Sequence, residues 1–93
     1  MRTIKRTAQF KRDYKREKRG SHRATLDDEL STIVRLLIVD AKLPELIHDH
    51  SLTGNLKDCR DCHIKPDLVL IYRKTNDNTL ELIRLGSHSE LGF

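Results

Sequence analysis

The sequence contains no long apolar run, no apolar leader and little cysteine. None of its apolar runs approaches the roughly 18 residues that a membrane-spanning helix requires, which excludes a membrane span. Residues 1–23 are dominated by Lys and Arg, so they do not have the composition of a secretory signal segment. We therefore expect a cytosolic protein in which the two cysteines, Cys59 and Cys62, stay reduced and form no structural disulfide.

The chain is also short of residues that could form a large core. Its 93 residues are 37% hydrophobic and 34% charged, which allows one two-layer domain over residues 1–93 with little apolar surface to spare. No internal repeat divides this domain.

Positive charge is concentrated near the N-terminus. Residues 1–23 carry ten Lys and Arg against two acidic residues, whereas residues 24–93 carry eight against twelve. Such a cluster of cations favours contact with a polyanion, either a nucleic acid or an acidic protein, and the alternative is a solvated helix face. The cations that we expect to make this contact are Lys11, Arg12, Lys15 and Arg16.

Apolar periodicity predicts two helices in the first half of the chain. Thr7 is placed to cap a helix over residues 8–19, which Gly20 ends. A capping box at Thr25–Asp28, with Asp in place of the usual Glu, begins a second helix. Its apolar residues recur with a 3.6-residue period, and Pro44 ends it. These apolar residues are assigned to the core.

The second half of the chain has the pattern of strands. A loop over residues 45–55 leads into three of them, and a short edge strand is expected over residues 2–6. The order of helices and strands predicts an α+β fold, with two N-terminal helices packed on a small antiparallel sheet. The three later strands are expected over residues 57–64, 68–74 and 79–85.

The segment from Cys59 to His63 has the spacing of a c-type haem attachment site. If this segment is a strand, however, Cys59 and Cys62 face opposite sides and cannot share a haem or a zinc ion. The same alternation buries Cys62 beside Ile64 and places Cys59, Asp61 and His63 on the other face. A small regulator that binds metal through the cysteines and histidines is the alternative.

Several titratable residues fall at strand ends and in neighbouring loops, a common layout for active sites. They are His50, His63, Asp67 and His88. Such a cluster beside a basic helix suits cleavage of RNA, in which one group removes the proton of the 2′-hydroxyl and another protonates the departing 5′-oxygen. Histidine titrates near neutral pH and can serve in either role. This route requires no metal ion or other cofactor, and DNA lacks the hydroxyl that it needs.

Three blocks of the sequence resemble the YafQ branch of the RelE-like bacterial toxins in order and spacing. They are Asp49–Gly54, the block Arg60–Tyr72 with its His-x-x-Pro-Asp motif, and Arg84–Leu91 with Gly-Ser-His. The combination of the two motifs is more specific than either alone, and the resemblance covers essentially the whole chain.

The resemblance implies a microbial-ribonuclease-like α+β fold and a toxin of a type II toxin–antitoxin system. Such a toxin cleaves messenger RNA in the ribosomal A site, inhibits translation and is neutralised by a cognate antitoxin. Contact with operator DNA would be made only through the antitoxin complex. The implied active-site positions are His50, His63, Asp67 and His88, with His88 as the general acid and the roles of the other three left open.

Two further residues are candidates for contact with the substrate, and only Arg60 matches a position of that family. Arg60 is one of them, but strand alternation places it on the face of Cys62, so a structural salt bridge is an equal alternative. Phe93 is the other, and it is expected either to stack on a base or to be a frayed terminal residue. Family members tend to have this Phe four residues after the histidine, whereas Phe93 follows His88 by five. A non-catalytic binding module of the same fold, like the gyrase-inhibiting toxins, remains the alternative to an enzyme.

Overall fold

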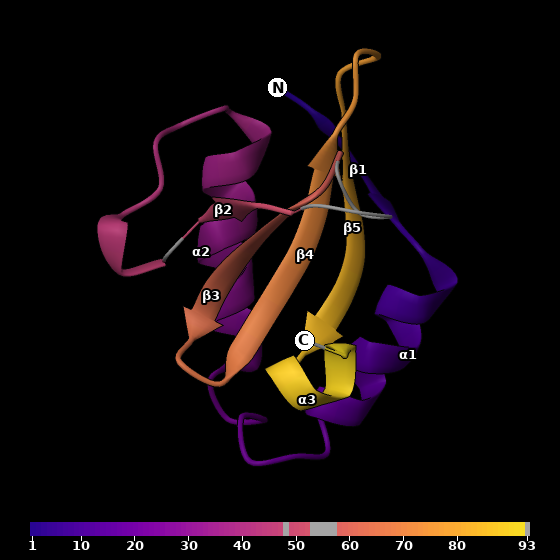
Figure 1. Ribbon diagram of the computed structural model, residues 1–93, viewed down its shortest axis with the longest axis vertical. Coiled ribbons are helices and arrows are strands. Elements are labelled where there is room, and N and C mark those ends of the chain that lie inside the picture. The colour runs from indigo at the N-terminus through magenta and orange to yellow at the C-terminus, as the bar shows by residue number, and fades with distance from the viewer. Residues whose placement is uncertain (48, 53–57, 93) are drawn as a thin grey trace.

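A computed structural model describes residues 1–47, 49–52 and 58–92 of the protein. In this part of the chain, two helices, α1 (Ala8–Glu17) and α2 (Leu26–Ile38), pack on one face of a five-stranded sheet (Figure 1). The strands are β1 (Thr3–Arg6), β2 (His50–Ser51), β3 (Arg60–Lys65), β4 (Leu68–Lys74) and β5 (Thr79–Gly86), and they are accompanied by a 3₁₀ turn, η1 (Glu45–Ile47), and a short helix, α3 (His88–Leu91).

The strand order is β1-β5-β4-β3-β2, with β4 in the centre. The pairs β5–β4, β4–β3 and β3–β2 are antiparallel, whereas β1 pairs with β5 in parallel, from Thr3 opposite Thr79 to Arg6 opposite Leu82. The predicted α+β class is confirmed, but the prediction of a wholly antiparallel sheet is wrong. A parallel pair requires a long connection between its strands. Here both long helices and the other strands lie between β1 and β5 in the chain, so the two strands can pair in parallel.

The helix ends differ from the prediction in three places. Thr7 caps α1 as predicted, since its hydroxyl accepts a hydrogen bond from the Phe10 amide at 3.0 Å, but the helix ends at Glu17. Thr25 makes no side-chain cap, so the predicted capping box is wrong. The second helix ends at Ile38, well before Pro44, because Asp40 turns the chain with a φ of 56°.

The predicted loop over residues 45–55 also contains secondary structure, in the form of η1 and β2. Both elements are too short to leave a periodic signal in the sequence. Gly54, the expected turn residue, lies outside the described residues. The predicted strand over residues 57–64 begins at Arg60 in the structure.

The apolar core lies between the helices and the sheet. The strands contribute side chains that include Cys62, Leu70 and Leu82, each at most 3% exposed. Burial raises the pKa of the Cys62 thiol to about 12, which agrees with its predicted role as a small core residue. No helix within the described residues has the length and apolar character that crossing a bilayer requires.

Candidate active site

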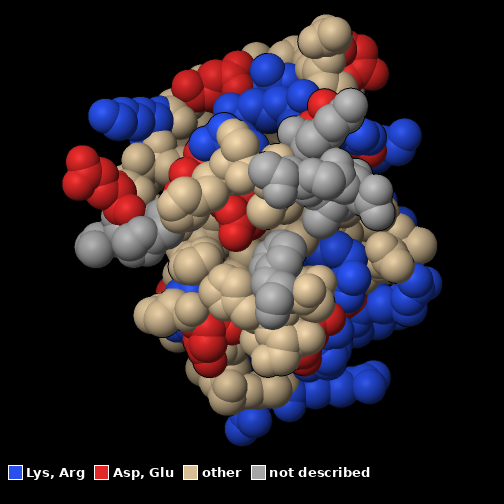
Figure 2. All heavy atoms as spheres, viewed as in Figure 1, with Lys and Arg blue, Asp and Glu red and all other residues tan. Residues whose placement is uncertain are grey.

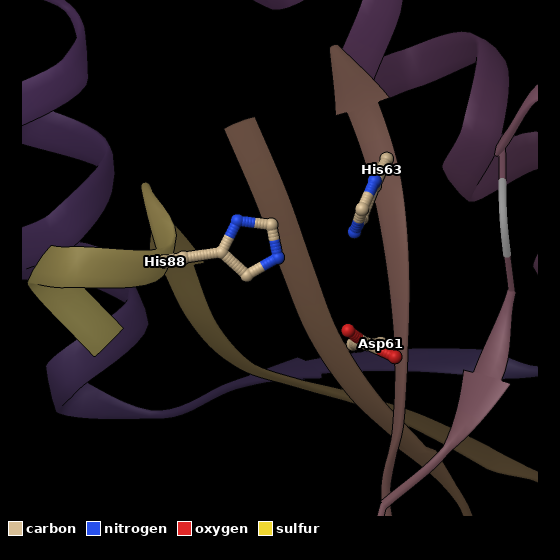
Figure 3. A group of neighbouring side chains, drawn as sticks. All are labelled: Asp61, His63 and His88. Atoms are coloured by element: carbon tan, nitrogen blue, oxygen red, sulfur yellow. The ribbon is translucent and has the colours of Figure 1, made fainter. Parts of the chain in front are cut away.

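A cluster of Asp61, His63 and His88 lies on the face of the sheet opposite the helices. Asp61 and His63 are two residues apart on β3, so they point to the same side, away from Cys62. His88 is the first residue of α3, and its ring extends towards them (Figure 3). The ring centroids of His63 and His88 are 5.0 Å apart at 78°. Ligand atoms from all three residues lie within 4.8 Å of one another.

Asp61 is the member of this cluster that was not predicted from the sequence as a site residue. It is only 7% exposed, and its Oδ1 atom is buried without a hydrogen-bond partner. A buried carboxylate oxygen normally accepts a hydrogen bond, so an unpartnered one beside two imidazoles suggests a functional group. The available signal was strand alternation, which places Asp61 on the face of His63.

The central strand β4 forms the floor beneath the cluster. Asp61 lies opposite Ile71 and His63 lies opposite Val69, and both apolar side chains are at most 1% exposed. On its other side, β4 places Val69 opposite Gly86, two residues before His88. Pairing with the buried strand β4 therefore holds both β3, which carries His63, and the end of β5, which leads to His88.

The structure places His50 and Asp67 differently. His50 is exposed on β2 and lies directly opposite Asp61, where cross-strand neighbours share a face. Asp67 lies in the turn before β4, with 70% of its side chain exposed and its Oδ1 3.1 Å from His22 Nε2. It lines a polar cavity of about 240 Å³ together with Ser87, next to His88. Asp61, not Asp67, is the carboxylate grouped with His63 and His88.

Arg60 makes the salt bridge that strand alternation suggested. Its Nε donates to Asp49 Oδ2 at 3.0 Å, and its Nη1 donates to Ser51 Oγ at 2.7 Å. The Tyr72 hydroxyl donates to the other oxygen of Asp49 at 2.7 Å. Burial and the Asp49 carboxylate raise the pKa of Tyr72. These contacts tie the chain on both sides of His50 to the sheet.

The predicted polyanion contacts of α1 divide into two groups. Lys11, Arg12 and Lys15 are exposed, and Figure 2 shows Lys and Arg gathered on the side of the molecule where α1 lies. Arg16 is also exposed, but it has the carboxylates of Asp13, Glu17 and Glu90 within 3.1 Å. The other predicted RNA contact, Phe93, lies outside the described residues.

A groove of about 630 Å³ runs beside the exposed cations, between α1, α2 and the edge of the sheet. Apolar side chains such as Phe10, Val34 and Leu82 line it, and Lys11 and Lys15 also contribute to its wall. The groove differs chemically from the His63 cluster. Its lining is mainly apolar, with basic side chains and Asp27, whereas the cluster consists of two imidazoles and a carboxylate.

Both cysteines are free and buried. Burial raises the pKa of the Cys59 thiol as well as that of Cys62, which disfavours the thiolate that a metal would bind. Within the described residues, neither cysteine belongs to a cluster with metal-ligating geometry. The metal-binding alternative based on the cysteines therefore finds no support in this arrangement.

Comparison with known proteins adds the identity of the family. The family model described as "Bacterial toxin of type II toxin-antitoxin system, YafQ" matches residues 2–92. The mRNA interferase toxin YafQ of Escherichia coli (strain K12) is 33% identical over 90 residues, or 95% of this chain and 97% of that protein. A copper-bound mutant toxin from Helicobacter pylori is 37% identical with a TM-score of 0.85, covering 98% of this chain and 99% of that one. The E. coli DinJ–YafQ complex contains a chain that is 34% identical with a TM-score of 0.82, covering 98% of each. The chain therefore belongs to the YafQ family of bacterial toxins of type II toxin–antitoxin systems.

Proposed function

We propose that this protein is an endoribonuclease that cleaves messenger RNA by general acid–base catalysis. The observation that carries the proposal is the contact between the imidazoles of His63 and His88 beside the unpartnered oxygen of Asp61. The similarity to a relative named mRNA interferase toxin supports messenger RNA as the substrate. These features favour an enzyme over a non-catalytic binding module of the same fold.

The reaction breaks the bond between phosphorus and the 5′-oxygen of the next nucleotide. The 2′-hydroxyl attacks phosphorus as it loses its proton to a base, and the leaving 5′-oxygen takes a proton from an acid. The products are a 2′,3′-cyclic phosphate and a 5′-hydroxyl end. We assign the acid to His88 and the base to the pair Asp61 and His63, because two proton-transfer groups must face the same phosphate.

The scissile phosphate is expected to lie across the outer edges of the two rings. Ring centroids 5.0 Å apart leave no room for a phosphate between the rings. His50 lies opposite Asp61 on β2, where it can contact the phosphate or a neighbouring ribose. Asp67 lines the polar cavity beside Ser87, and we expect it to orient the RNA chain near the cleaved bond.

We further infer that the reaction occurs on cytoplasmic ribosomes and inhibits translation. The exposed cations Lys11, Arg12 and Lys15 are suited to contact ribosomal RNA phosphates, a contact that should weaken with salt. Ribosome dependence is tested by comparing cleavage of one messenger RNA with and without ribosomes.

A cognate antitoxin is the expected protein partner, by similarity to the toxin in the DinJ–YafQ complex. The groove beside α1 combines an apolar lining with Lys11 and Lys15, which suits an acidic amphipathic segment of the antitoxin. Lys11→Glu with Lys15→Glu should then weaken antitoxin binding at low salt. An unchanged dissociation constant would remove this groove from the interface.

The test of the enzymatic proposal is to map RNA ends after the toxin is produced. New ends within coding regions should carry a 2′,3′-cyclic phosphate or the 3′-phosphate formed by its hydrolysis. His88→Ala should abolish these ends while antitoxin binding is retained. Growth arrest with intact messages would instead indicate the non-catalytic alternative.

A second candidate role for the cluster is to bind a transition metal, by similarity to the copper-bound toxin. Asp61, His63 and His88 fit such an ion, because two imidazoles and a carboxylate suit Cu²⁺ or Zn²⁺. A metal would occupy the nitrogen lone pairs that proton transfer needs, so it should inhibit cleavage. Calorimetric titration with Cu²⁺ should detect binding to the wild type and none to Asp61→Ala. Equal binding by both proteins would exclude this site.

A further inference from the structure

The helix that carries His88 requires an anchor outside its own turn. α3 has four residues and none of them is buried. Its capping box pairs the Ser87 amide with Glu90 Oε1 at 2.9 Å and the Glu90 amide with Ser87 Oγ at 3.2 Å. One turn gains too little from its own hydrogen bonds to hold a fixed direction. The direction of the His88 ring must therefore depend on contacts with the rest of the protein.

Arg16 of α1 supplies contacts on both sides of His88. Its Nη2 donates to the carbonyl of Leu85 at 2.8 Å, near the end of β5. Its Nε lies 2.9 Å from Glu90 Oε2, within α3. Glu90 thus uses one oxygen for the capping box and the other for Arg16. A single guanidinium joins the strand that leads into α3 to the turn that carries the histidine.

Gly86 leaves the space through which Arg16 reaches these partners. A Cβ atom added at Gly86 would lie 2.6 Å from Arg16 Nη2 and 3.2 Å from Glu90 Oε1. Real Cβ atoms essentially never come as close to another heavy atom as the first distance, so a larger residue would displace the guanidinium. The glycine of the Gly-Ser-His motif and Arg16 therefore belong to the same arrangement.

Two further carboxylates hold the guanidinium in place. Asp13 is 4% exposed, and its Oδ1 accepts from Arg16 Nη1 at 3.0 Å while its Oδ2 accepts from the Leu85 amide at 3.0 Å. Glu17 Oε2 lies 3.1 Å from Arg16 Nε. Burial alone would raise the pKa of Asp13, but hydrogen bonds from Arg84 and the Leu85 amide keep it below its ordinary value. Asp13 and Glu17 therefore hold Arg16 in place before RNA binds.

We propose that Arg16 is a positioning residue that aims His88 at His63 through Glu90 and Leu85. The inference rests on the proposed ribonuclease function, since it assigns a task within that site. It also gives Arg16 a different role from the phosphate contact that its place on a basic helix suggested. A phosphate contact acts on binding, whereas a positioning residue acts on the chemical step, so the two roles are separable by kinetics.

The first experiment measures single-turnover RNA cleavage by Arg16→Gln, Lys15→Gln and Arg35→Gln. Arg16→Gln should lower the rate at saturation by about 10- to 100-fold, because misplacing a catalytic group by about 1 Å can cost that much. Its half-saturating concentration and its salt dependence should stay within about two-fold of the wild type. Lys15→Gln should raise the half-saturating concentration and reduce the salt dependence. Arg35 is exposed on α2, and its variant should match the wild type.

The second experiment needs no RNA and therefore does not depend on the ribonuclease proposal. The imidazole resonances of His88 and the amide exchange of Ser87–Leu91 are followed by NMR in Arg16→Gln, Glu90→Gln and Gly86→Ala. All three variants should shift the His88 resonances and speed amide exchange in α3. Arg16→Lys should not restore the wild-type values, because an ammonium cannot reproduce the planar fork that bridges Leu85 and Glu90.

Arg16→Gln leaves three carboxylates without their cation, so this variant can fail to fold. In that case Gly86→Ala and Glu90→Gln still test the proposal. Thermal unfolding of each variant identifies that case. Unchanged His88 resonances and α3 exchange in folded variants would overturn the proposal, as would an Arg16→Gln effect confined to substrate binding. If the wild type cleaves no RNA, the proposed function fails, and the NMR result still decides whether Arg16 orients His88.

Discussion

The two faces of strand β4 differ in what covers them. On one face, Leu68, Leu70 and Tyr72 pack into the core beneath α1 and α2. On the other, Val69 and Ile71 are equally buried, but their cross-strand neighbours are His63 and Asp61. Burial alone therefore does not distinguish the structural face from the functional one. The difference is the chemistry of the covering side chains, and a strand fixed on both faces gives titratable groups a rigid support.

The largest expected effect comes from breaking the functional face. His63→Ala should lower the cleavage rate by about 10²- to 10⁴-fold, the usual contribution of a proton-transfer group. Stability should fall by less than about 1 kcal/mol, because His63 is partly exposed. Single-turnover cleavage and urea unfolding measure the two quantities. Cys62→Ala, the adjacent residue on the helix side, should keep the wild-type rate, and full activity in His63→Ala would exclude His63 from the mechanism.

The structural face should respond in the opposite way. Leu70 is 0% exposed, so Leu70→Ala should lower the free energy of unfolding by about 2–5 kcal/mol. The folded fraction should still cleave RNA at the wild-type rate. Val39 is 54% exposed, and Val39→Ala should change stability by less than about 0.5 kcal/mol. A loss of activity in Leu70→Ala without unfolding would show that the two faces are not independent.

The helix side of the molecule was largely predictable from the sequence, because apolar periodicity reports burial directly. The apolar stripe of α2 and the alternation of Cys62 and Ile64 both identify residues that the structure places in the core. The parallel pairing of β1 was not predictable in this way, since a short edge strand carries no signal for its partner. The early end of α2 depends on the left-handed backbone of Asp40. An Asp side chain tolerates this conformation but does not require it, so the residue type does not predict the helix end.

The open face was predictable only in part. His63 and His88 were selected because histidine is the residue type suited to the chemistry, and the structure brings them into contact. Asp61 was passed over in favour of Asp67, although it lies two residues from His63 on the same strand, because its other partner, His88, is distant in the sequence. Arg16 was grouped with Lys15 because charge on a helix does not reveal that Arg16 also contacts Leu85 and Glu90, which are distant in the sequence. Such differences depend on tertiary contacts that local patterns do not encode.

Asp61→Asn tests the functional face of β4 further, with an expected effect of intermediate size. The substitution keeps the shape of the side chain and removes its charge. The buried Oδ1 atom, which has no hydrogen-bond partner, is then part of a neutral amide and not of a carboxylate. We expect cleavage to fall by about ten-fold or more, while the free energy of unfolding stays within about 0.5 kcal/mol or rises. Wild-type cleavage by Asp61→Asn would show that the carboxylate takes no part in proton transfer.

The smallest effect concerns the ion pairs that Asp40 makes with Arg2 and Lys74. Asp40 follows α2 and lies 2.8 Å from both Lys74 Nζ and Arg2 Nε. The hydrogen bond from Lys74, followed by that from Arg2, lowers the pKa of Asp40 from 3.8 to about 2. Because the folded state favours the carboxylate, this contribution to stability is present above about pH 4 and is lost as the pH falls towards about 2.

Asp40→Asn isolates that charge, because Asn also tolerates the left-handed backbone at this position. The variant should be slightly less stable than the wild type at pH 5, and the difference should shrink between about pH 4 and pH 2. Solvent screens an exposed pair, so the difference should also shrink in about 1 M salt. Urea unfolding at pH 5, 3 and 2, and at pH 5 with and without about 1 M salt, measures both trends. A difference that stays constant with pH would mean that Asp40 stabilises the end of α2 through its backbone and not through its charge.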